Sequence, residues 1–202
     1  MIDFVATFIF FFAVIDPIGT VPVFIAVTSQ YDERTKRMVA VKATLVAGAI
    51  LLFFVVAGEY ILAAMDIPLA AFQIAGGIVL FLFALSMIFG ESKPEEEVKL
   101  ARHGSETAVF PLAVPSIASP GAMLAAVLLT ENARFSVLEQ TQTAATMFAV
   151  LLVVLVLLLC AGWIHRFIGS SGASIVSRIM GMILAAVATA SALAGIKEYF
   201  AL

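Results

Sequence analysis

The sequence has few of the residues that enzymes most often use for chemistry. It holds one cysteine and two histidines in 202 residues, and only 12% of its residues are charged. A single cysteine excludes an internal disulfide and dithiol redox chemistry, and two isolated histidines do not make a metal site. No nucleophile, base and orienting residue occur together, so the sequence predicts no enzyme activity, no metal and no cofactor.

Other absences narrow the range of functions further. The net charge of −3 is spread over several segments, and the lack of a basic patch argues against a nucleic-acid partner. The sequence has no phosphate-binding motif of the form G-x-x-x-x-G-K-[ST], so ATP is not expected to drive its function. The first apolar run has no basic residues before it and no small-residue cleavage site after it, which predicts a retained helix and not a signal peptide.

Long apolar runs are what the sequence has in abundance. Its residues are 63% hydrophobic, with a mean hydropathy of +1.14, and the runs are about twenty residues long, which is enough to span a bilayer. The pattern predicts an all-α integral membrane protein with six transmembrane helices. These are expected at residues 2–28, 38–64, 69–89, 107–129, 141–164 and 173–197, with a loop at 165–172 before the last.

Two proline-containing stretches, at residues 14–22 and 114–121, interrupt the first and fourth of these helices. Pro17 and Pro22 recur as Pro115 and Pro120, each 98 residues later, and the same offset carries the second helix onto the fifth. Because proline disrupts a helix, we expect broken helices 1 and 4 in a 3+3 inverted repeat, with the two breaks facing each other near the midplane. The expected units are a first repeat at 1–90, a polar cytoplasmic loop at 91–106 and a second repeat at 107–202.

Lys and Arg are distributed unequally between the two sides of this arrangement. One side holds Arg34, Lys36, Arg37, Lys42, Lys93, Lys99, Arg102 and Arg166. The other side holds only Arg134 and Lys197. Because short positive loops face the cytoplasm, the sequence predicts that both termini are extracytoplasmic.

Asp16 is the one carboxylate well inside a predicted span. An ionisable group in that position is costly and by default marks a binding site or an ion pathway. Asp followed by Pro17 is also a favourable helix start, with Asp as the N-cap. The two roles are compatible, so we expect Asp16 both to cap a half-helix and to contact substrate or a coupling proton.

Small and hydroxyl-bearing residues surround the two interruptions. They are Gly19, Thr20, Ser116, Ser119 and Gly121. They could serve close helix packing, or they could line a small cavity with unpaired backbone groups. Helix N-termini would then point partial positive charge at the cavity and hold a carboxylate there. With Asp16 facing an ammonium group, such a substrate-binding cavity would suit a small zwitterion.

Other polar and small residues have plainer expected roles. Gly77 and Gly181 are expected to allow close helix packing. Glu131 falls near the end of a span and is expected to be solvated. Arg178 either extends its side chain to the membrane interface or pairs with a carboxylate on a neighbouring helix.

Four stretches resemble signature sequences of the MarC family. They are DPIGTVPVF at 16–24, QIAGGI at 73–78, FPLAVP at 110–115 with SPG at 119–121, and SRIMG at 177–181. The resemblance covers the whole chain and implies a six-span protein of the prokaryotic plasma (inner) membrane, grouped with small amino-acid carriers and exporters. Some members are described as proton-coupled transporters of neutral amino acids such as alanine and glycine.

The residues and this resemblance together favour a secondary transporter of small neutral amino acids. It would be coupled to protons and work by alternating access around the two interruptions. Two alternatives stay open: an exporter or channel for another small solute, and a non-transporting membrane scaffold in which the interruptions serve packing alone. The oligomeric state is left open between a monomer and a homo-oligomer.

Overall fold

A computed structural model describes residues 4–89, 108–132 and 134–201, apart from the side chains at 165–171, 173 and 177. All regular structure in these residues is helical. The elements are α1 (Phe4–Ile15), α2 (Pro17–Val27), α3 (Glu33–Ala64), α4 (Leu69–Phe89), η1 (Ala108–Ile117), α6 (Pro120–Leu128), α7 (Val137–Leu159) and α8 (Ala161–Tyr199).

The helices have the length and composition of membrane spans. Among the described residues, five stretches are long and apolar enough to cross a bilayer, and one of them is the 24-residue stretch that α1 and α2 form together. A sixth is added if η1 and α6, which are bent by 57° relative to each other, count as one span. The part of the chain that the structure describes is therefore built of helices and supplies five or six candidate membrane spans.

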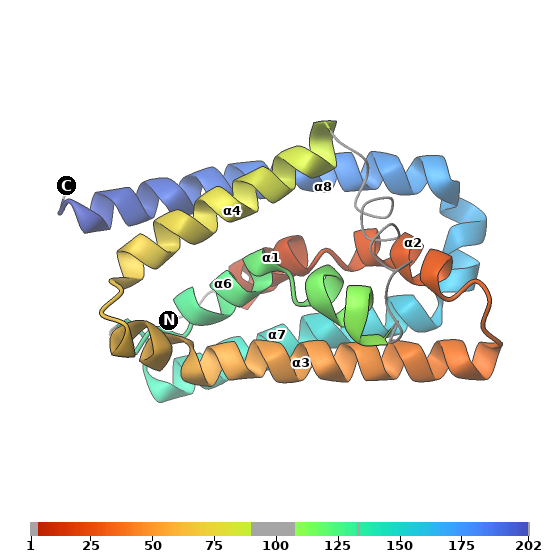
Figure 1. Ribbon diagram of the computed structural model, residues 1–202, viewed down its shortest axis with the longest axis horizontal. Helices are drawn as coiled ribbons and strands as arrows, with labels where there is room; N and C mark the ends of the chain where they lie inside the picture. The colour runs from red at the N-terminus through yellow and green to blue at the C-terminus, as the bar shows by residue number, and fades with distance from the viewer. Residues whose placement is uncertain (1–3, 90–107, 133, 202) are drawn as a thin grey trace.

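The helices lie in three groups (Figure 1). Helices α4 and α8 run side by side along one edge, α3 and α7 run along the opposite edge, and α1, α2 and α6 lie between them. In an apolar 18-residue stretch of Phe4–Val27, 61% of the residues are buried, whereas 22% are buried in the corresponding 18 residues of α4 and of α8. The centre therefore forms the core, and the outer helices present most of their apolar side chains to the surroundings.

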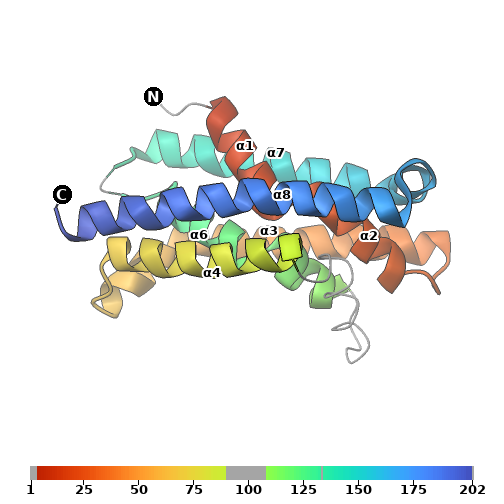
Figure 2. The same ribbon diagram turned by 90° about the horizontal axis from the view of Figure 1, so that it is seen from above.

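A row of small residues joins α4 to α8, which run in opposite directions (Figure 2). A Cβ added at Gly77 of α4 would lie 2.9 Å from the backbone N of Ala192, and one added at Gly181 of α8 would lie 3.0 Å from the carbonyl O of Ala84. Backbones that approach this closely leave no room for side chains, as at other small-residue helix interfaces in membranes. The expected packing role of both glycines is confirmed.

Several predicted boundaries change in the structure, including the start of α7, which lies at Val137 and not at residue 141. Helix α4 has the predicted bounds, but α3 begins at Glu33 because its basic first turns continue the helix beyond the apolar run. Helix α2 passes through Pro22 without a break. The loop predicted at 165–172 is wrong, since α7 ends at Leu159 and α8 starts at Ala161 and continues through that region. The polar segment predicted at 91–106 lies outside the described residues.

Helix α7 starts with a capping box. The Ser136 hydroxyl accepts a hydrogen bond from the Glu139 backbone N–H at 3.4 Å, and the Ser136 backbone N–H donates to Glu139 Oε2 at 3.0 Å. Replacing Ser136 with Ala is expected to lower the free energy of unfolding by about 1 kcal/mol, since an N-cap acceptor is lost. Thermal unfolding of the purified protein in detergent measures the change.

Ser136→Thr is the matched control for the cap. Thr keeps both the hydroxyl acceptor for the Glu139 N–H and the hydroxyl donor to Glu139 Oε2, so this variant should unfold close to the wild type. Equal destabilisation by Ala and Thr would show that the cap is not the source of the effect.

Candidate functional site

Asp16 forms the junction between α1 and α2. Its backbone adopts the left-handed conformation, with φ 51° and ψ 66°, which ends α1 at Ile15. Its Oδ1 accepts a hydrogen bond from the Gly19 backbone N–H at 3.0 Å, and Pro17 occupies the first position of α2. Asp and Asn are among the few residues that adopt this conformation readily. The predicted capping role of Asp16 is confirmed.

Ser119 forms the equivalent junction between η1 and α6. Its hydroxyl accepts a hydrogen bond from the Ala122 backbone N–H at 3.1 Å, and Pro120 starts the helix. Within η1 the backbone is extended at Phe110 and Val114. Each of these residues precedes a proline, which disfavours helical geometry in the residue before it.

Two buried hydrogen bonds join these junctions. The Ser116 hydroxyl donates to Thr20 Oγ1 at 3.1 Å, and Thr20 Oγ1 in turn donates to the Asp16 carbonyl O at 3.0 Å. The Ser119 hydroxyl donates to the Val14 carbonyl O at 2.7 Å. That carbonyl belongs to the last turn of α1, where the helix itself leaves carbonyl groups without partners.

The structure thus brings most of the predicted site residues together in the protein interior. Asp16, Thr20, Ser116 and Ser119 are each at most 1% exposed. Water therefore does not reach these four side chains from the surface in this conformation. The Val14 carbonyl was not predicted, and its only sequence signal is its position two residues before Asp16.

The two predicted site glycines have different surroundings. A Cβ at Gly19 would lie 2.0 Å from Asp16 Oδ2, so the carboxylate folds over this residue and glycine is needed there. A Cβ at Gly121 would lie 2.5 Å from Leu80 Cδ1, on α4. Gly19 therefore belongs to the Asp16 junction, whereas Gly121 lets α6 approach α4.

A hollow of about 380 Å³ lies between the central helices and the α4–α8 pair. Its lining includes Phe10 of α1, Gln73 of α4, Arg134 in the α6–α7 connection and Ser191 of α8. Phe10 precedes Asp16 by about 9 Å of helix, at 1.5 Å per residue. The hollow therefore approaches the buried junction from the end of the molecule that carries the α6–α7 connection.

Ionic contacts at this same end were not predicted. Arg134 Nε lies 2.9 Å from Glu131 Oε2, and the Arg134 guanidinium also pairs with Glu198 at the end of α8. The Asn132 side chain and backbone each donate to Glu59 Oε2 of α3 at 2.8 Å. These contacts join three elements that are far apart in the sequence.

Glu131 was expected to be solvated, but the structure buries it. Its side chain lies against Arg134. Burial raises the pKa of Glu131 above its usual value, the charges of Glu198 and Glu59 add to the rise, and Arg134 opposes it. A raised pKa in the folded state stabilises the fold at low pH, and that stabilisation is lost as pH rises through the raised pKa. Glu131→Gln should remove this pH dependence, as measured by thermal unfolding from about pH 4 to about pH 7.

Glu139→Gln provides a comparison of opposite sign. Hydrogen bonds from the Ser136 backbone and side chain lower the pKa of Glu139. The stabilisation of the fold by Glu139 is therefore present above its usual pKa and is lost as the pH falls through the lowered pKa. The two variants should therefore shift the stability profile in opposite directions. Parallel profiles for wild type and Glu131→Gln would contradict the assignment to Glu131.

Arg178 makes a backbone contact that the sequence did not predict. Its guanidinium donates to the Ile88 carbonyl O at 2.9 Å, at the end of α4. Lys and Arg near a helix C-terminus commonly satisfy such carbonyls. Among the described residues, no group of three or more His, Cys, Asp or Glu side chains is placed to bind a metal.

A family model and several known proteins match nearly the whole length of the chain. A family model described as MarC family integral membrane protein matches residues 1–200. The chain is 36% identical over 197 residues to the UPF0056 membrane protein MJ1677 of Methanocaldococcus jannaschii, covering 96% of both chains. It is 30% identical over 202 residues to the UPF0056 inner membrane protein YhgN of Escherichia coli strain K12, covering 98% of both.

A third relative is the UPF0056 membrane protein of Aquifex aeolicus, which is 31% identical over 200 residues, with 96% of this chain and 92% of the relative covered. No solved structure matches the chain. The resemblance seen in the four sequence motifs is thereby confirmed. The chain belongs to the MarC family of integral membrane proteins.

Proposed function

We propose that this protein is a secondary transporter of small neutral amino acids such as alanine or glycine, coupled to protons, and not an enzyme. The observation that carries the proposal is the buried contact between the two helix junctions, where Asp16 lies beside the Ser116–Thr20 hydrogen bond. Irregular backbone at membrane depth is tolerated only where protein buries it or where it lines a cavity. In transporters, such interruptions form the substrate site.

The packing of the two halves supports an inverted repeat. Under the 98-residue offset α3 corresponds to α7, and Gly48 of α3 lies against Leu151 of α7. Helices α4 and α8, the third members of each half, also pack on each other in opposite directions. Counterparts of an inverted repeat are expected to meet in this way about a pseudo-two-fold axis.

The local chemistry favours a zwitterionic substrate. Helices α2 and α6 both begin at the junctions, and a helix N-terminus carries partial positive charge that stabilises an anion. Asp16 supplies the opposite charge in the same buried region. We assign Asp16 to the substrate ammonium group or the coupling proton, and Gly19, Thr20, Ser116, Ser119 and Gly121 to the walls of the site.

Four of these side chains are inaccessible to water in the present conformation, so substrate entry requires movement. The hollow of about 380 Å³ approaches the junctions from one end, and the Arg134–Glu198 ion pair connects the α6–α7 connection with α8 beside it. Alternating access includes states in which the substrate site is closed to one or both sides of the membrane. The buried site of this conformation is consistent with such a closed state.

Transport into liposomes tests the proposal. Purified protein in liposomes should take up labelled alanine or glycine with saturation, and an imposed pH gradient should increase the rate. Uptake equal to that of protein-free liposomes in both directions of the gradient would contradict it. Current without saturable amino-acid flux would favour a channel for another solute, and the absence of any flux or ligand-dependent thermal shift would favour a scaffold.

A further inference from the structure

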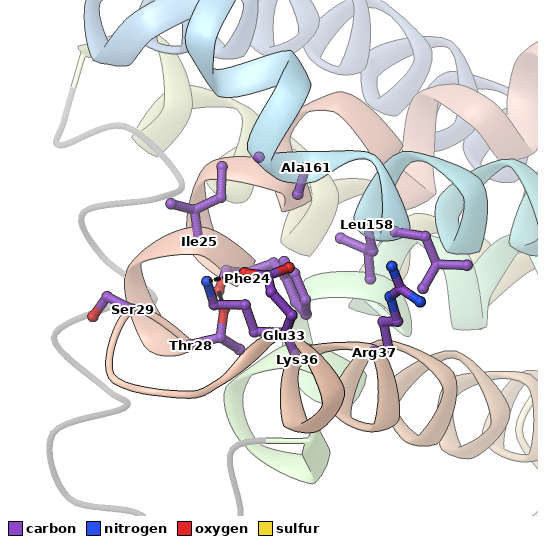
Figure 3. A pocket seen from close by; sticks show the side chains of 11 residues that line it. Phe24, Ile25, Thr28, Ser29, Glu33, Lys36, Arg37, Leu158 and Ala161 are labelled. Atoms are coloured by element: carbon purple, nitrogen blue, oxygen red, sulfur yellow. Dashed lines mark hydrogen bonds and ion pairs between the residues drawn. The ribbon is translucent and has the colours of Figure 1, made fainter.

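A second cavity lies at the opposite end of the molecule from the α6–α7 connection (Figure 1), and Figure 3 shows it from close by. It has a volume of about 130 Å³ and is formed where the end of α2, the first turns of α3 and the α7–α8 junction meet. Its volume is well above the roughly 10–15 Å³ that a cavity needs on the same measure to hold one water molecule. The cavity is separate from Asp16 and takes no part in the proposed transport site.

One side of this cavity carries a net positive charge, because its lining holds the two cations Lys36 and Arg37 and the one carboxylate of Glu33. Lys36 Nζ lies 2.8 Å from Glu33 Oε1, but the Glu33 side chain is 80% exposed. Exposed ion pairs of this kind have a small interaction free energy, so this pair holds Lys36 only weakly. Arg37 extends from α3 toward Leu158 (Figure 3), and no described carboxylate lies within ion-pair distance of it. The N-terminus of α3 adds partial positive charge at the same place.

The other side of the cavity is apolar. Phe24 and Leu158 are buried there, and Leu159 is exposed beside them. The Thr28 hydroxyl donates to the Phe24 carbonyl O at 2.6 Å, within its own helix. A ligand would therefore find its hydrogen-bond donors on Lys36 and Arg37 and an apolar wall opposite, which is the surface that an anionic amphiphile requires.

Exposed aromatic residues beside the cavity indicate that it lies at the depth of lipid headgroups. Trp163, the one tryptophan of the chain, is 68% exposed and follows the lining residue Gly162. Tyr31, in the connection between α2 and α3, is 37% exposed at the same end. Exposed Trp and Tyr are enriched where a membrane protein crosses the boundary between hydrocarbon and water.

We propose that this cavity binds an acidic phospholipid of the adjoining leaflet. Its phosphate is held by Lys36 and Arg37, and its acyl chain lies along Leu158 and Leu159. Basic pockets between membrane helices are known to bind anionic headgroups in this manner, and the Arg guanidinium presents paired donors that match phosphate oxygens. The site is independent of the proposed transport activity.

Lipid binding to the full-length purified protein in detergent tests the site. The measurement is the thermal unfolding midpoint as a function of added phosphatidylglycerol, compared with phosphatidylcholine carrying the same acyl chains. Phosphatidylglycerol should bind more tightly, and the double variant Lys36→Gln/Arg37→Gln should weaken its binding about thirtyfold, or about fivefold for each cation. Equal binding of the two lipids by the wild type would overturn the proposal.

The matched control is Arg34→Gln/Lys42→Gln, which removes the same charge from α3 but alters no lining residue. It should retain tight phosphatidylglycerol binding, and an equal loss in both double variants would mean that only overall charge matters. Lys36→Arg keeps the charge and the hydrogen-bond donors on this side of the cavity and should also retain binding. Inorganic phosphate at the same concentration should produce no shift; a shift equal to that of the lipid would identify a soluble phosphate as the ligand and overturn the proposal.

Discussion

Replacing Asp16 with Asn is expected to reduce gradient-driven amino-acid uptake to the level of protein-free liposomes while leaving the protein folded. Asn accepts the N-cap hydrogen bond as well as Asp does, and it also tolerates the left-handed backbone at φ 51°. The change therefore removes the negative charge and keeps the geometry. Uptake is measured with and without a pH gradient, and thermal unfolding is measured on the same preparation.

Asp16→Ala separates the charge from the local structure. Ala lacks the cap acceptor and is strained in the left-handed conformation, so this variant should lose about 2 kcal/mol of stability in addition to transport. If Asp16→Asn keeps the wild-type response to the pH gradient, Asp16 is not the coupling carboxylate. If it retains uptake but loses the response to the gradient, the residue carries the proton and not the substrate.

Gly19→Ala provides an independent check on the position of the same carboxylate. The new Cβ would lie 2.0 Å from Asp16 Oδ2. The Asp16 carboxylate must therefore move away and lose the hydrogen bond that it accepts from the Gly19 backbone N–H. Uptake should fall although Asp16 is unchanged. Gly162→Ala is the control, because a Cβ there meets nothing within 4 Å.

The second large effect is expected at the contact between α4 and α8. In Gly77→Ala the added Cβ would lie 2.9 Å from the Ala192 backbone N and 3.0 Å from the Ala188 carbonyl O. Backbone atoms cannot rotate away, so the two helices must separate along their length. Overpacking of this kind costs roughly 1–3 kcal/mol, which thermal unfolding in detergent should detect.

The adjacent glycine distinguishes this clash from a general effect of Ala. In Gly76→Ala the atoms nearest the added Cβ would be side-chain atoms of Leu124 and not backbone, at 2.5 Å for Cδ1 and 2.9 Å for Cγ. A leucine side chain can change its χ1 rotamer whereas backbone cannot, so Gly76→Ala should be destabilised less than Gly77→Ala. The reverse order would contradict the tight backbone contact of α4 with α8.

The bounds of the elements were predictable where an apolar run ends at a clear signal. Helix α4 has the predicted bounds because Pro68 precedes it, and proline suits a helix start. The start of α3 and the continuous α8 were missed because they depend on polar or small residues outside the apolar runs. Ser and Gly at 169–172 indicated a loop, but local propensity is a weak signal that tertiary context overrides.

The candidate site was predictable as a set of residues but not as a set of contacts. The proline spacing and the hydroxyl residues indicated that Thr20 and Ser116 lie near each other, and they share a hydrogen bond. The bond from Ser119 to the Val14 carbonyl was missed, because every residue has a carbonyl and none is marked in the sequence. The Arg134–Glu198 pair was missed because its partners are 64 residues apart.

Cys160 lies at the turn between α7 and α8 and is exposed, and the chain has no other cysteine. The unaltered protein therefore carries a single thiol at the end opposite the α6–α7 connection. A membrane-impermeant maleimide that labels it in inverted vesicles, and not in intact cells, would assign that end to the cytoplasm. The native chain can thus report its own orientation in the membrane without any engineered reporter.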